Sequence, residues 1–206
     1  MDINWYPGHM AKAKRLINES LKAVDIVIEV LDARIPVSSR NPDFEEMFAK
    51  RQKIIILNKT DLADSFITDK WVEYFKKHGI QTICVSSVDN SNKKKIVDFI
   101  KKSAASIVDK YKSKGMNKTV RCMVAGIPNS GKSTFINMLC GKGKLKSEDR
   151  PGVTKANQWI KVDKSLEIMD TPGVLWPKLD EQRIALNLSF VGSIKDNIID
   201  IEELAC

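Results

Sequence analysis

Residues 126–133 read GIPNSGKS and match the pattern G-x-x-x-x-G-K-[ST] in full. They follow an apolar, β-branched run at 119–126 and precede a run typical of a helix at 132–141. A strand, a glycine-containing loop and a helix in this order direct backbone N–H groups and the helix N-terminus at bound phosphate. By chance the pattern should occur in under about 1% of chains of this length. It therefore predicts an α/β fold with a phosphate site.

The side chains of this loop suit a nucleoside triphosphate. The Lys132 ammonium can bridge the β- and γ-phosphates, and the Ser133 hydroxyl can bind Mg²⁺. The residues predicted to contact phosphate are Asn129, Ser130, Gly131, Lys132, Ser133, Thr134 and Gly173.

A second phosphate element follows at DTPG, residues 170–173. Asp170 ends a strand-like run and can orient a Mg²⁺-bound water, while the Gly173 N–H can reach the γ-phosphate. Taken alone, the same four residues also make a good turn. Thr154, in RPGVT, is the only Thr between the helix and the next strand and is the natural second hydroxyl ligand to Mg²⁺; an ordinary loop Thr is the alternative.

A base-reading motif stands at 57–62, LNKTDL. The Asp61 carboxylate can accept hydrogen bonds from guanine N1–H and its N2 amino group, and adenine would leave this carboxylate unpaired at a cost. Asn58 can reach the imidazole side of the base, and the Lys59 stem can cover its face. The loop at Ser86 and Ser87 can present a backbone N–H to guanine O6. Together with the phosphate loop, these residues favour GTP over ATP.

The chain alternates β-branched runs with helical stretches. Strands are expected at 24–33, 53–59, 81–87 and 119–126, and a hairpin at 157–163 and 165–170. Helices are expected at 41–50, where Asn41 is the N-cap and Pro42 the first helical residue, and at 68–79, 92–113 and 132–141. This alternation predicts βαβ units and a mainly parallel sheet, with ligands beyond the carboxyl ends of the strands. All the nucleotide motifs should therefore meet at one edge of one sheet.

Charge indicates the kind of partner. The 206 residues carry a net charge of +8, which favours polyanions such as nucleic acid. Residues 92–121 hold ten Lys or Arg and only two acids, which fits either a solvated helix face or an RNA-contacting face. The apolar runs are too short to span a bilayer, and the four scattered Cys indicate reduced thiols in a cytosolic protein.

The order of the motifs is rotated. GTPases usually begin with the phosphate loop and end with the base-reading loops, whereas here both base-reading loops come first. With NWYPGHMAKA, DARIPVSSRNP and DTPGVLWPK, this order resembles the circularly permuted GTPases of the ribosome biogenesis GTPase A family, from Asn4 to about Asp200. The resemblance implies a three-layer, Ras-like P-loop GTPase domain with a permuted connection. One departure is Ser86-Ser87, where the family more often has Asn-Ser or Ser-Ala.

The resemblance also implies a function. The chain is expected to be a GTPase that assists late maturation of the large (50S) ribosomal subunit, with GTP/GDP, the subunit and rRNA as partners, and to act as a cytoplasmic monomer. Besides 92–121, Lys12, Lys14 and Arg15 are candidate rRNA contacts. A nucleotide-gated switch for a protein or tRNA, with incidental hydrolysis, is the alternative.

The residues after Gly173 are Val174, Leu175 and Trp176, and none can polarise a water, so a low unaided rate is expected. His9 is the candidate catalytic group by resemblance; capping or packing at a helix start is the alternative. By resemblance, Asn129 holds K⁺ beside the phosphates. Residues 1–180 are expected to form the GTPase domain with an N-terminal helical extension, and 181–206 to begin a helical C-terminal segment that is truncated relative to the family.

Overall fold

The computed structural model describes residues 7–141, 159–176 and 182–194, and for residues 7–10 the backbone alone. Six strands of this part form one sheet in the order β3-β2-β1-β4-β6-β5. Their bounds are β1 Ile26–Asp32, β2 Gln52–Asn58, β3 Gln81–Cys84, β4 Val120–Ala125, β5 Trp159–Lys161 and β6 Leu166–Asp170. All neighbours pair in parallel except β5, which runs antiparallel to β6. The predicted mainly parallel α/β sheet is confirmed.

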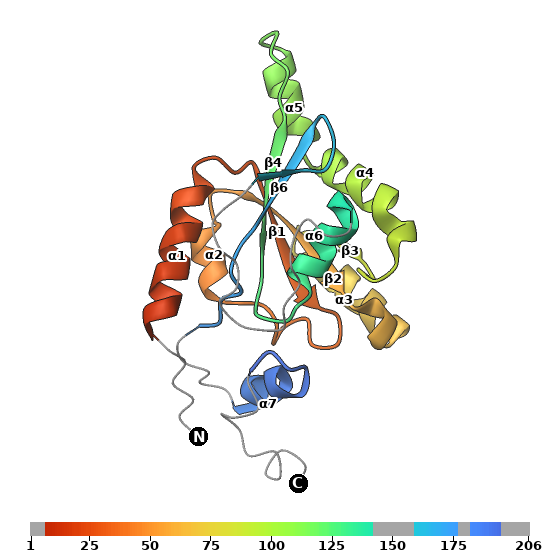
Figure 1. Ribbon diagram of the computed structural model, residues 1–206. Helices are drawn as coiled ribbons and strands as arrows, with labels where there is room; N and C mark the ends of the chain where they lie inside the picture. Colours follow the sequence, from red (N-terminus) through yellow and green to blue (C-terminus); the bar gives the residue numbers. More distant parts are fainter. Residues whose placement is uncertain (1–6, 142–158, 177–181, 195–206) are drawn as a thin grey trace.

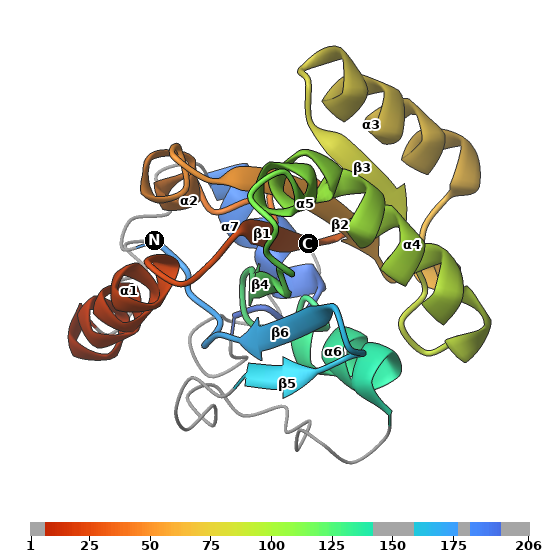
Figure 2. The same ribbon diagram turned by 90° about the horizontal axis from the view of Figure 1, so that it is seen from above.

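Helices cover both faces of this sheet. The α-helices are α1 Pro7–Leu21, α2 Asp43–Met47, α3 Ser65–Lys77, α4 Lys93–Ser103, α5 Ala105–Lys112, α6 Lys132–Cys140 and α7 Gln182–Phe190, and short 3₁₀ turns are η1 Thr60–Leu62 and η2 Asn90–Asn92. Seen from above, α1 and α2 lie on one side of the sheet and α4 and α6 on the other (Figure 2). The result is a three-layer domain, with α5 and α7 at opposite ends of the molecule (Figure 1).

The core follows from strand alternation, because successive side chains point to opposite faces. Ile26, Ile28 and Val30 of β1 share one cluster with residues of α4 and α6. Val27, on the other face, packs in a cluster with residues of α1 and α2, and Leu31 packs with Phe75 of α3. A central strand buried on both faces reads as a continuous apolar run, as β1 does apart from Glu29 and its last residue, Asp32.

The predicted helix at 92–113 is wrong in one respect, because it divides at Ala104 into α4 and α5. Ala104 has φ −84° and ψ −2°, and its N–H is shared between the carbonyls of Ile100 and Lys101. The Ser103 hydroxyl donates to the Phe99 carbonyl at 2.9 Å. Such a bond from a Ser side chain to the preceding turn bends helices, and α5 thereby takes a direction of its own.

The predicted helix at 41–50 is shorter, because α2 spans only Asp43–Met47 and Phe48 leaves the helical region at φ −104° and ψ 9°. At its start Pro42 already has helical angles, and Asn41 Oδ1 accepts the Asp43 N–H at 3.0 Å, the bond expected of the predicted cap. The Asn41 amide donates to the Val174 carbonyl at 2.9 Å. Asn41 thus joins this turn to the segment after Gly173.

Other boundaries differ by small amounts. Helix α3 starts at Ser65 rather than at residue 68, because the Asp64 carboxylate accepts the Ile67 N–H at 2.8 Å and so caps the helix earlier. Strand β3 ends at Cys84 rather than at residue 87, and 85–87 continue as a loop. Only Trp159–Lys161 of the predicted 157–163 strand is described.

The described cysteines, Cys84, Cys122 and Cys140, are free thiols. Burial raises the pKa of the Cys84 and Cys122 thiols, which keeps them protonated. In the ranges that the structure describes, no helix combines the length and the apolar character that crossing a bilayer requires.

Candidate functional site: a nucleotide pocket at the carboxyl edge of the sheet

The predicted motifs gather where four parallel strands end. Strands β1, β2, β4 and β6 end at Asp32, Asn58, Ala125 and Asp170. NKTD stands at the end of β2, the phosphate loop follows β4, and DTPG stands at the end of β6. The end of β1 leads into DARIPVSSRNP. Because parallel strands share one carboxyl edge, this is where an α/β sheet binds its ligand. The loops lie at the end of the molecule nearer α7 (Figure 1).

The phosphate loop joins β4 to α6 in a tight turn. Asn129 and Gly131 have left-handed backbones, with φ of 58° and 89°, and Gly131 is the N-cap of α6. A Cβ at Gly131 would collide with the Asn58 amide nitrogen, so glycine alone lets the two loops approach. The helix N-terminus with its free N–H groups therefore opens onto the pocket.

Lys132 lies within this turn and is 7% exposed. Its ammonium donates to the Ile127 carbonyl at 2.7 Å, so it folds back over the loop. Burial lowers the pKa of Lys132 to about 8, partly offset by the Asp170 carboxylate and reinforced by the Lys59 charge. A cation held where its charge is poorly solvated is well placed to pair with an anion such as phosphate.

Ser133 and Asp170 form an oxygen-rich corner. The Ser133 hydroxyl donates to Asp170 Oδ2 at 3.2 Å, and Asp170 is 5% exposed. Its other oxygen, Oδ1, is buried with no hydrogen-bond partner among the described residues. Burial raises the pKa of Asp170, with Lys132 and Ser133 opposing it. Hard oxygen donors with one acceptor unused fit Mg²⁺. Thr154, the predicted third ligand, lies outside the described residues.

The DTPG segment packs directly on the phosphate loop. The Thr171 hydroxyl donates to the Val124 carbonyl at 2.8 Å, and the Val174 N–H to the Gly126 carbonyl at 3.3 Å. A Cβ at Gly173 would lie 2.8 Å from Pro128 Cα and 3.0 Å from Lys132 Nζ. This segment therefore borders the place where Lys132 would meet a terminal phosphate.

Asn58 joins the base-reading loops to the phosphate loop. Its amide donates to the Ser130 carbonyl at 3.0 Å, and its Oδ1 accepts the Ser87 hydroxyl at 2.7 Å and the Ser87 N–H at 3.2 Å. Asn58 is 1% exposed, so these bonds are shielded from water. Both ends of the side chain hold the three loops in place.

Lys59 makes a second connection. It has a left-handed backbone, φ 62°, and its ammonium donates to the Asn129 carbonyl at 2.6 Å and lies 3.0 Å from Asp32 Oδ2. Asp32 also accepts a bidentate pair from Arg34, at 2.9 and 2.7 Å. Burial would raise the pKa of Asp32, but the bonds from Arg34 and Lys59 outweigh it and hold it below its usual value.

Asp61 and Ser86 carry oxygen acceptors that no described residue uses. Asp61 is exposed in η1, and no hydrogen bond from another described residue reaches its carboxylate. Ser86 Oγ is buried, and the described part of the chain offers it no partner. The Thr60 N–H donates to the Val85 carbonyl at 3.3 Å, which ties the two loops together. The two base-reading loops are therefore neighbours in the fold, as the predicted guanine site requires.

Comparison with known proteins agrees with this arrangement. A family model described as "50S ribosome-binding GTPase" matches residues 121–202. The Ribosome biogenesis GTPase A of Bacillus licheniformis is 48% identical over 206 residues, which cover 100% of this chain and 73% of the relative. This chain belongs to the ribosome biogenesis GTPase A family. It is a GTPase of ribosome biogenesis.

Members of the ribosome biogenesis GTPase A family and their relatives share the fold as well. The crystal structure of GNP-bound YlqF from Thermotoga maritima matches with a TM-score of 0.71 at 32% identity, over 94% of this chain and 71% of that one. Mitochondrial ribosome-associated GTPase 1 of Bos taurus is 34% identical over 98% of this chain and 63% of the relative. The permuted, mainly parallel P-loop fold predicted from the motif order is thereby confirmed.

Helix α7 packs against the phosphate loop and the residues after DTPG. Leu188 and Ile194 share an apolar cluster with Ile127, Leu175 and Trp176. The Asn129 amide donates to the Gly192 carbonyl at 2.6 Å. Helix α7 and the turn after it are thus joined to the phosphate loop and to the residues after DTPG. The predicted division of the chain at residues 180 and 181 stays a prediction.

His9 falls in the first turn of α1, and its side chain lies outside the described residues. Its role stays a prediction. Sequence reasoning missed Asp32 and Arg34 as site residues, although both stand in the quoted DARIPVSSRNP, and gave Asn41 only as a helix cap. For Asp32 and Arg34 the signal was position: polar residues at the end of a buried strand belong to the ligand edge of the sheet.

Proposed function

We propose that this chain is a GTP-hydrolysing assembly factor for late maturation of the large (50S) ribosomal subunit, and that the ribosomal particle activates it. The observation that carries the proposal is the match of residues 121–202 to the 50S ribosome-binding GTPase model. That range contains the phosphate loop and the DTPG segment. A cytoplasmic monomer working on a large polyanion suits the net charge of +8.

Each motif residue has a proposed part in binding GTP. Backbone N–H groups from residue 129 to residue 134 surround the phosphates, and Lys132 neutralises the β- and γ-phosphates. Asp61 reads guanine N1–H and N2, while Ser86 and Ser87 present the loop that meets O6. Asn58 and Lys59 support this reading by holding the loops, as their bonds to Ser130 and Asn129 indicate.

The metal corner is proposed to hold Mg²⁺ through the Ser133 hydroxyl and Thr154, with Asp170 acting through a water. When bound, Mg²⁺ would offset charge that develops on the phosphate oxygens. The buried, unpartnered Oδ1 of Asp170 supports this assignment. The Ser133 hydroxyl could keep donating to Asp170 Oδ2 while a lone pair on its oxygen faced the metal.

The attacking water needs an orienting group, and His9 is proposed for it once the ribosomal particle is bound. Val174 and Leu175 are buried and apolar, so they cannot supply one. Asn129 is proposed to hold K⁺. Its exposed side chain lies on the phosphate loop, and its amide nitrogen is occupied by Gly192 at 2.6 Å, which leaves Oδ1 to face a cation.

The test is GTP turnover with and without purified 50S particles, measured in K⁺ and in Na⁺ buffers. The proposal expects slow turnover alone, strong stimulation by 50S and a further increase in K⁺. No stimulation by 50S would favour a nucleotide-gated switch for a protein or tRNA instead. Equal turnover in K⁺ and Na⁺ would remove the assignment of Asn129.

A further inference from the structure

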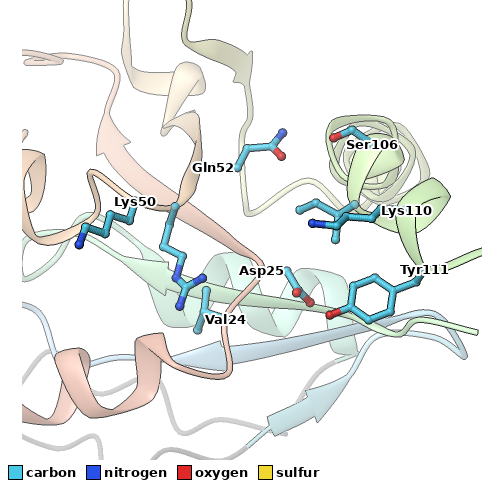
Figure 3. Close-up of a pocket in the computed structure, with 9 residues that line it drawn as sticks. Val24, Asp25, Lys50, Gln52, Ser106, Lys110 and Tyr111 are labelled. Carbon is cyan, nitrogen blue, oxygen red and sulfur yellow. The ribbon is translucent and has the colours of Figure 1, made fainter. Parts of the chain in front are cut away.

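A hollow of about 520 Å³ opens at the end of the sheet opposite the nucleotide pocket. Asp25 directly precedes β1, and Lys50 and Arg51 directly precede β2, so these lining residues stand at the amino edge of the sheet. Lys110 and Tyr111 of α5 form the other wall. Figure 3 shows Lys50 on one side, Lys110 and Tyr111 on the other, and Asp25 between them.

Three cations of this hollow are not neutralised. Within the described ranges, the side chains of Lys50, Arg51 and Lys110 have no carboxylate at ion-pairing distance and no hydrogen-bond partner. Several other cations near the sheet are paired, for example Lys53 with Glu45 at 3.5 Å. Keeping like charges together without partners has an electrostatic cost, which an anionic ligand would remove.

The one acid that lines the hollow is already satisfied. Asp25 Oδ2 lies 2.9 Å from the Lys118 ammonium and accepts the Arg121 N–H at 2.9 Å. Its negative charge is therefore offset by Lys118 and does not cancel the three free cations. The hollow therefore carries a net positive charge, and Lys110 places one of its walls within the basic stretch 92–121.

Besides its positive charge, the hollow has an aromatic side chain, Tyr111, in its wall. Lys110 and Tyr111 are neighbours on α5, and Ser106 lies one turn before Lys110 on the same wall. The Tyr111 ring is half-buried, with the Lys118 ammonium 5.2 Å from its centroid. Cations along a groove combined with an aromatic ring are typical of sites that hold phosphates and stack one base of a single strand.

We infer that this hollow binds single-stranded RNA, with backbone phosphates on Lys50, Arg51 and Lys110 and a base against Tyr111. The inference rests on the proposed function, because it gives ribosomal RNA a stated surface. The hollow lies at the sheet edge opposite the GTP motifs, so RNA and nucleotide can bind at the same time.

The test is fluorescence anisotropy with a labelled single-stranded RNA of about 16 nucleotides, measured over a range of salt concentrations. The triple variant Lys50→Gln, Arg51→Gln, Lys110→Gln should bind at least about 10-fold more weakly, and the slope of log affinity against log salt should fall by about 2. The matched control is Lys70→Gln, Lys76→Gln, Lys77→Gln, which removes the same charge from exposed positions on α3. Tyr111→Leu should bind about 10-fold more weakly with an unchanged slope.

Unchanged RNA affinity in the hollow triple, or equal loss in both triples, would overturn the inference. So would displacement of the RNA by polyglutamate as effective as by unlabelled RNA of equal charge, because the hollow would then accept any acidic polymer. An unaltered affinity of Tyr111→Leu would likewise contradict base stacking. None of these readouts involves GTP turnover, so failure here is distinguishable from failure of the 50S stimulation test.

Discussion

The Asn58 amide donates a hydrogen bond to the Ser130 carbonyl at 3.0 Å, across 72 positions of the chain. Through it the base-reading motif, which comes first in the sequence, meets the phosphate loop, which comes later. Permutation changes the connections between strands and leaves the neighbours of β1 in place, namely β2 and β4. The pocket therefore depends on long-range side-chain bonds.

Asn58→Ala should lower both the free energy of unfolding and the affinity for guanine nucleotides. The change leaves the Ser130 carbonyl and the Ser87 hydroxyl without their buried partner, at a cost of about 2 kcal/mol or more. Denaturant unfolding and titration with a fluorescent GDP measure the two effects. The matched control is Asn92→Ala, whose bond to Asp89 is exposed; its unfolding should shift by less than about 0.5 kcal/mol. Equal effects of the two variants would remove Asn58 as the link between the loops.

Gly173→Ala should weaken binding of a non-hydrolysable GTP analogue by about 10-fold or more, with a smaller effect on GDP. The added Cβ would lie 2.8 Å from Pro128 Cα, so the DTPG segment must move off the phosphate loop, and overpacking of this kind typically costs about 1–3 kcal/mol. Calorimetric titration of both nucleotides measures the ratio. The neighbouring Pro172→Ala, which adds no atom, is the control. Equal loss for GDP and the analogue would argue against γ-phosphate sensing at Gly173.

Glu29 is a buried acid in the middle of β1, 1% exposed, with Arg40 Nε 3.6 Å from its Oε2. Burial raises the pKa of Glu29 from 4.5 to about 7, although Arg40 and Lys53 oppose the rise and Glu45 adds to it. The folded chain thus binds this proton more tightly than the unfolded chain does. The resulting stability is fully present below pH 4.5 and is lost as the pH rises through 7.

Glu29→Gln should remove this pH dependence. Relative to the wild type, the variant should gain stability between about pH 4.5 and pH 7, by on the order of 3 kcal/mol. Urea unfolding at several pH values gives the difference directly, since other titrating groups contribute to both proteins. Glu46→Gln is the control, because it removes the same charge from an exposed position on α2. A difference that is flat with pH would contradict the burial argument.

His9→Ala should abolish most of the turnover that 50S particles stimulate, while GTP affinity stays within about twofold. General acid–base groups contribute about 10²–10⁴-fold to rate, and a group that orients water acts after GTP has bound. Single-turnover hydrolysis with 50S measures the effect. His78→Ala is the control, since His78 is the exposed C-cap of α3 and its Nδ1 lies 2.7 Å from the Tyr74 carbonyl. Full stimulated turnover in His9→Ala would leave His9 a structural role only.

The phosphate loop and the strand–helix alternation predicted the sheet, because both depend on local pattern. The division of 92–113 at Ala104 was not predicted, and the Ser103 hydroxyl there also contacts Gln81 of β3, a partner that the sequence alone does not place beside it. The ion pair between Asp32 and Lys59 could not be predicted from the sequence either, because the two side chains meet only once β1 and β2 lie side by side. The local sequence therefore indicates which residues belong to the pocket, whereas tertiary contacts determine which of these residues bond to one another.

The central claim is that Asp61, early in the chain, reads the base of a nucleotide held by the later phosphate loop. Xanthine carries a carbonyl where guanine carries its N2 amino group, and an Asn amide can donate to that carbonyl. The direct measurement is the affinity of wild type and Asp61→Asn for GTP and xanthosine triphosphate. We expect Asp61→Asn to lose about 100-fold in GTP affinity and to bind xanthosine triphosphate more tightly than the wild type does. Unchanged GTP affinity in the variant would contradict the account.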